Sequence, residues 1–126
     1  MDIKETRELL RRVVEEKGRD FRYAPKDANG LACYYAPRPD MFAEDDPRAT
    51  SPCMVGAVFA LAGIEVDPRE TDSADNLAAR HGFSWVAQRY LRKAQIHQDN
   101  GATWGDSYDV AEEWYQAHLR EMAAAQ

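Results

Sequence analysis

The sequence predicts a mainly α protein of the α+β class. Four to five helices form a compact bundle around a buried central helix at about 52–62, with one small β-hairpin at about 20–36. Three observations lead to this fold. The segment 51–63 has no charged residue and is apolar on every side, as in a helix buried on all faces. Apolar residues recur at helical spacing on both sides of it. An Asn-Gly pair at 29–30 separates two alternating aromatic segments, which is a hairpin signal.

Length and composition fit one soluble globular domain spanning 1–126. The chain has 126 residues, of which 44% are hydrophobic and 30% charged. The longest apolar run is too short to cross a membrane, and the first residues do not resemble a signal peptide. Two cysteines, Cys33 and Cys53, are too few for a disulfide framework, so we expect a protein of the reducing cytoplasm.

The first helix is expected over residues 2–17. Asp2 and Glu5 have the spacing of a capping box, and Gly18 supplies the stop. One apolar stripe faces the core and consists of Ile3, Leu9, Leu10, Val13 and Val14. The hairpin at 20–36 follows and needs helices against it, because an isolated hairpin is only marginally stable.

Residues 37–50 contain three prolines and no periodicity, which indicates a long loop. Long loops in compact domains are often functional. Met41 and Phe42 lie in the middle of it, where they either pin the loop to the body or form an exposed contact. The loop acids Asp40, Glu44, Asp45 and Asp46 lack the alternating ligands and central glycine of a calcium loop, so we predict no metal there.

The central helix has well-marked ends. Ser51 is suited to the cap, Pro52 to the first helical position and Gly63 to the left-handed residue after the last turn. Gly56 and Ala60, four residues apart, would allow a neighbouring helix to approach closely.

Three further helices are expected after the central one. A short helix covers 73–80, and a longer one runs from 84 to about 98 with its basic residues turned outward. Thr103 and Asp106 form a cap pair that opens the last helix. That helix carries aromatic and apolar residues at helical spacing, namely Trp104, Tyr108, Ala111, Trp114, Tyr115, His118 and Met122.

The net charge of −6 argues against non-specific nucleic-acid binding. Charge is nevertheless segregated along the chain: residues 77–98 carry only bases, and residues 99–126 hold six acids against Arg120. The bases are Arg80, Arg89, Arg92 and Lys93. They form either a solvated helix face, which we favour, or part of a site for a small anionic ligand.

Few residues suggest catalysis. Cys53 at a helix start could be a thiolate nucleophile, but no catalytic cysteine signature surrounds it, and we favour core packing. His97 and Asp99 form either an acid–base pair or a charge-compensated helix end, and we favour the second. Cysteines and histidines are too far apart for the paired ligands of a zinc site. We therefore predict no cofactor and no metal, and favour a non-enzymatic protein.

Two motifs lie in the C-terminal half of the chain. One is a Cys-x-x-Gly helix that ends in Gly, and the other is Gln-x-x-Gln-Asp-x-Gly-x-x-Trp-Gly. Their positions are Cys53, Gly56, Gly63, Gln95, Gln98, Asp99, Gly101, Trp104 and Gly105. In this pattern the chain resembles small uncharacterised proteins of actinobacteria and their bacteriophages. The resemblance spans roughly 50–115. It implies a cytoplasmic setting, in the host if the protein is phage-encoded, and implies no activity.

The sequence favours a binding protein whose partner is a protein, such as a host or cellular factor. The candidate contact residues are Met41, Phe42, Arg89, Arg92, Trp104 and Asp99. The alternative is a nucleotide-sequestering protein in which the basic side chains bind the phosphates and Trp104 stacks on the nucleobase. A Cys53-dependent hydrolase ranks third. We expect no membrane or nucleic-acid partner, and the oligomeric state is open.

Overall fold

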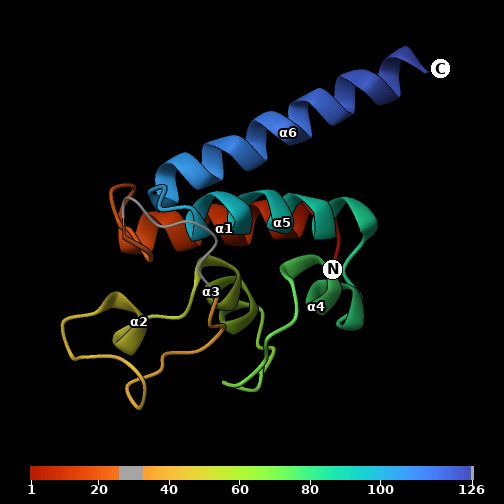
Figure 1. Ribbon diagram of the computed structural model, residues 1–126. Helices are drawn as coiled ribbons and strands as arrows, with labels where there is room; N and C mark the ends of the chain where they lie inside the picture. Colours follow the sequence, from red (N-terminus) through yellow and green to blue (C-terminus); the bar gives the residue numbers. More distant parts are fainter. Residues whose placement is uncertain (26–32, 126) are drawn as a thin grey trace.

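The computed structural model describes residues 1–25 and 33–125 (Figure 1). Six helices lie in these ranges: α1 (Ile3–Lys17), α2 (Pro47–Thr50), α3 (Met54–Leu61), α4 (Ala74–Arg80), α5 (Trp85–Asp99) and α6 (Trp104–Ala124). Apart from the four-residue α2, each has seven residues or more. The mainly α prediction is confirmed.

The structure does not support the predicted hairpin at 20–36. Its turn lies within 26–32, outside the described residues, and the flanks 20–25 and 33–36 form no strand. Backbone groups of both flanks bind helix starts, and the flanks meet through the Tyr23 hydroxyl, which accepts the N–H of Tyr34 at 3.2 Å. The carbonyl of Phe21 accepts the N–H of Trp104 at 2.8 Å, and that of Tyr34 accepts the N–H of Cys53 at 2.8 Å. The alternating aromatic pattern therefore marks a segment that packs against helix starts, not a strand.

Helix α1 follows its sequence signals. The Asp2 carboxylate accepts the N–H of Glu5 at 2.8 Å, and Gly18 ends the helix with a φ of 93°. Its buried side chains are Thr6, Leu10, Val13 and Val14, and the helix packs on α3, α5 and α6.

Helix α3 differs from the prediction in its start and its burial. Its cap is Cys53, not Ser51, because the Cys53 N–H is held by the Tyr34 carbonyl and its sulfur accepts the N–H of Gly56 at 3.4 Å. Ala60 is exposed, so the helix is not buried on all faces. The end at Gly63, with a φ of 76°, is as predicted.

The segment that approaches Gly56 closely is irregular backbone at Tyr35, not the neighbouring helix that the sequence predicts. A Cβ at Gly56 would lie 2.2 Å from the carbonyl oxygen of Tyr35, so only glycine fits. The segment before the loop therefore crosses α3 at this residue.

The most widely connected helix is α5, which packs on α1, α3, α4 and α6. Figure 1 shows α6 lying across α5 and α1, with α2, α3 and α4 on the opposite side of that layer. The C-terminal part of α6 extends beyond the rest of the molecule (Figure 1). The bundle is thus organised around α5 more than around the predicted central helix.

Candidate binding surface

Two glutamines of α5 are buried and satisfy the starts of other helices. The carbonyl oxygen of Gln98 accepts the N–H of Met54, the first residue of α3, at 2.6 Å. That of Gln95 accepts the N–H of Ala74, the first residue of α4, at 2.9 Å. The first N–H groups of a helix have no partner within it, so these contacts replace lost hydration. Both glutamines of the motif are structural.

The Trp-Gly part of the motif is also structural. Trp104 is fully buried, and its indole N–H donates to the Gln98 oxygen at 3.1 Å. A Cβ at Gly105 would lie 2.7 Å from the Cβ of Arg19, so this glycine admits the segment that follows α1. Trp104 has no exposed face on which a nucleotide base could stack.

Asp99 is half-buried at the end of α5, where burial raises the pKa of its carboxyl to about 6. The Gln98 amide donates to it at 3.0 Å, and this bond and the charge of Arg92 partly oppose the rise. No hydrogen bond or ion pair joins Asp99 to His97 among the described residues. Burial therefore accounts for the raised pKa of Asp99, and Asp99 is not paired with His97.

The expectation of unpaired cysteines is wrong. Cys33 and Cys53 form a disulfide with a Cα–Cα distance of 5.7 Å, and both are buried. A disulfide sulfur is not a thiolate, so Cys53 in this state is not the nucleophile of a hydrolase. The bond also removes the basis for expecting a reducing compartment. The two cysteines are 20 residues apart with no motif between them, so the sequence did not signal the pairing.

The bases of residues 77–98 do not converge on one anion site. Arg80 pairs with Glu70, and Arg92 lies 3.5 Å from the Asp75 carboxylate. Arg89 is exposed, with its guanidinium carbon 5.3 Å from the centre of the Trp85 ring. These placements, with Trp104 buried, separate the residues that the nucleotide hypothesis groups together.

The loop at 37–50 is held by internal contacts. Arg38 binds the Asp40 carboxylate through two nitrogens, at 3.0 and 2.8 Å, and donates to the Pro68 carbonyl at 3.0 Å. The Arg38 N–H also binds the Arg48 carbonyl at 2.9 Å, which links the two sides of the loop. The loop therefore has a defined conformation despite having only one helical turn.

The far side of the loop is fixed by Asp46. This carboxylate caps α2 by accepting the N–H of Arg48 at 2.9 Å, and it binds the Arg48 guanidinium at 3.0 and 2.7 Å. The guanidinium holds the pKa of Asp46 below its usual value. Two of the four loop acids, Asp40 and Asp46, thus bind arginines, and no cluster of three metal-ligating side chains occurs among the described residues.

Met41 and Phe42 are neighbours with different roles. The Phe42 ring packs edge-on against Tyr34, with centroids 5.3 Å apart, and the Arg48 guanidinium covers it at 4.1 Å. Phe42 therefore pins the loop to the body. Met41 has half of its surface exposed (51%). Of the two readings left open by the sequence, Phe42 follows the first, and Met41 has the exposure that the second requires.

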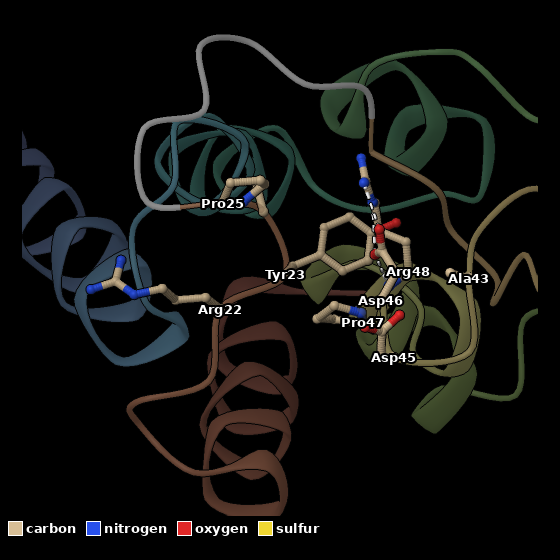
Figure 2. Close-up of a pocket in the computed structure, with 9 residues that line it drawn as sticks. Arg22, Tyr23, Pro25, Ala43, Asp45, Asp46, Pro47 and Arg48 are labelled. Atoms are coloured by element: carbon tan, nitrogen blue, oxygen red, sulfur yellow. Dashed lines mark hydrogen bonds and ion pairs between the residues drawn. The ribbon is translucent and has the colours of Figure 1, made fainter.

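A pocket of about 390 Å³ lies beside this loop, between residues 22–25 and 43–48. Figure 2 shows Tyr23 at its centre and the Asp46–Arg48 pair at one wall, while the guanidinium of Arg22 points away to the other side. Arg22 donates to the Gly101 carbonyl. Arg22, Asp46 and Arg48 of the lining are thus engaged with protein atoms, and the pocket extends the loop surface.

Comparison of the chain with protein-family models, curated proteins and solved structures gives no match. Among the described helices, none is both long and apolar enough to cross a membrane.

Proposed function

We propose that this protein is a non-enzymatic binding module that recognises a protein partner through the loop at 37–50, which lies between Cys33 and Cys53. The observation that carries the proposal is the contrast within the loop. Arg38, Arg48 and Phe42 are engaged in internal contacts, whereas Met41 presents an apolar side chain to solvent on a fixed backbone.

Order in the free loop favours binding. A flexible loop loses conformational freedom when it binds, and that loss subtracts from affinity. Here the disulfide closes the base of the loop, and the Arg38–Asp40 and Arg48–Asp46 pairs hold its two sides. The entropic cost of ordering it has already been met in the fold.

Methionine suits the contact position. Its side chain is unbranched and polarisable, adapts to irregular apolar surfaces, and is enriched at protein interfaces. The pocket lined by Tyr23, Pro25 and Pro47 also includes Ala43 of the same loop, and it offers a recess for a side chain of the partner. We further propose, from the sequence resemblance, that the partner is a host or cellular factor in an actinobacterial or phage setting.

The test compares capture by three forms of the protein from an actinobacterial lysate without reductant. Wild type is compared with Met41→Ala and with Met122→Ala, whose methionines are exposed to similar extents, 51% and 54%. Met122 belongs to the C-terminal end of α6, and Figure 1 shows that end of α6 on the other side of the molecule from α2. We expect one stoichiometric protein, identified by mass spectrometry, that Met41→Ala loses and Met122→Ala keeps. Capture that survives Met41→Ala, or no capture by wild type, contradicts the proposal.

A further inference from the structure

Helix α6 carries one apolar stripe along its whole length, but the body covers only the first half. Trp104, Ser107 and Ala111 are buried, Trp114, Tyr115 and His118 are half-buried, and Leu119 and Met122 are 43% and 54% exposed. These positions repeat at three- and four-residue spacing, the pattern of a single helix face. The exposed half therefore continues a core pattern where there is no core.

The cause is a difference in helix length. α5 has 15 residues and α6 has 21. The ring of Trp85, the first residue of α5, lies 6.0 Å from the ring of His118. The segment 119–124 of α6, here called the free end, therefore extends past the start of α5, as Figure 1 shows.

The surface at the base of the free end has the composition of an interface centre. Trp85 is 56% exposed. Its ring is covered on one side by Arg89, and the half-buried Trp114 stacks on His118 with planes 11° apart. Tryptophan and arginine are the residue types in which binding energy concentrates at interfaces, and methionine is enriched there.

Charge on this surface is of both signs and separated by helix. Arg89 and Lys93 lie on the exposed face of α5, and Glu113 and Glu121 are exposed on α6. None of these four takes part in an ion pair within the described part of the chain. The last turn of α6 has no basic residue, so the negative end of its helix dipole is also uncompensated by a side chain.

We propose that the partner of this surface is a second copy of the chain, bound about a two-fold axis through antiparallel α6 helices. A two-fold interface must be self-complementary, because each copy contributes the same patch. An apolar centre flanked by bases on one helix and acids on the other meets this condition. The free end of each copy covers the start of α5 in the other, and Glu121 faces Arg89 of the partner copy.

The test is the mass in solution, measured by sedimentation equilibrium from low micromolar to near-millimolar concentration. The monomer mass is 14.3 kDa, and we expect wild type to rise to twice that value. Leu119→Glu and Met122→Glu, both at exposed positions, should remain monomeric with an unchanged helical circular dichroism signal. Met41→Ala is the control and should dimerise like wild type.

A charge exchange tests the orientation of the two copies. Arg89→Glu should weaken dimerisation by about tenfold, and adding Glu121→Arg in the same chain should restore it. A wild-type monomer at every concentration, a Leu119→Glu dimer, or no restoration by the exchange overturns the inference. None of these results affects the loop proposal, which is tested by loss of capture in Met41→Ala.

Discussion

The buried face of α5 and the free end of α6 depart from the usual distribution of residues in opposite directions. α5 places Gln95 and Gln98, 5% and 0% exposed, inside the core, whereas α6 leaves Leu119 and Met122 in solvent. The glutamines are stable inside because each hydrogen bonds the start of another helix. Within the described chain, no element covers the apolar side chains of Leu119 and Met122 in a comparable way.

The comparison shows that polarity alone does not separate core from surface in this protein. A buried amide is explained by the backbone groups that it satisfies, and an exposed apolar stripe by the neighbour that it lacks. The following predictions change one side of this comparison at a time, starting with the largest effect.

Gln98→Leu should have the largest effect. It leaves two buried donors, the N–H of Met54 and the indole N–H of Trp104, without their acceptor. Each unsatisfied buried group costs about 1–3 kcal/mol, so we expect the free energy of unfolding to fall by about 2–6 kcal/mol. Urea unfolding measures this. The same change at the exposed Gln116 should alter stability by less than about 0.5 kcal/mol, and equal effects at the two positions would refute the role of Gln98.

Loss of the disulfide should come next. Closing a loop of about this length restricts the unfolded chain and contributes about 3 kcal/mol. The double variant Cys33→Ala, Cys53→Ala should lose this amount relative to oxidised wild type. Wild type unfolded and refolded in dithiothreitol should lose a similar amount. If reductant leaves the unfolding midpoint of wild type unchanged, the bond contributes no stability.

Asp99→Asn should stabilise the protein in a pH-dependent way. Burial raises the pKa of Asp99 to about 6 in the folded state, above the usual value of 3.8, so the folded protein binds the proton more tightly than the unfolded chain. Stability from this group is therefore lost as pH rises from about 4 to above 6. Asparagine keeps an acceptor for Gln98 without the charge. We expect a gain of about 1–2 kcal/mol at pH 7.5 that disappears near pH 4; a gain that is equal at both values would be inconsistent with this cause.

The helices were largely predictable from sequence because their signals are local. The Asp2–Glu5 cap, the Thr103–Asp106 cap pair and the glycine at 63 act within a few residues, and the structure uses them as expected. The hairpin was not predictable, because an aromatic alternation does not show whether its backbone pairs with a strand or, as at Phe21 and Tyr34, with a helix start.

The candidate surfaces were predictable only in part. Met41 and Phe42 were identified from the loop around them. Which of the two is packed and which is exposed depends on Tyr34 and Arg48, which contact Phe42 only in the fold. The disulfide likewise depends on distant parts of the chain meeting. The exposed stripe of α6 had one usable signal, the greater length of its apolar pattern compared with that of α5.

The two tryptophans that begin α5 and α6 give the smallest expected effect and its matched control. Both are the first residue of a helix, but Trp85 is 56% exposed and Trp104 is fully buried. Trp85→Ala in the monomer should reduce the free energy of unfolding by less than about 1 kcal/mol, whereas Trp104→Ala should reduce it by about 3–5 kcal/mol. Urea unfolding at low protein concentration measures both.

If Trp85→Ala proves as destabilising as Trp104→Ala at a concentration where the chain is monomeric, Trp85 belongs to the core and not to a docking surface. If instead the loss of stability in Trp85→Ala is small and grows with protein concentration, and that in Trp104→Ala does not grow, Trp85 lies at the contact between two copies. Association stabilises the folded chain more at higher concentration, and a variant of the interface loses that contribution.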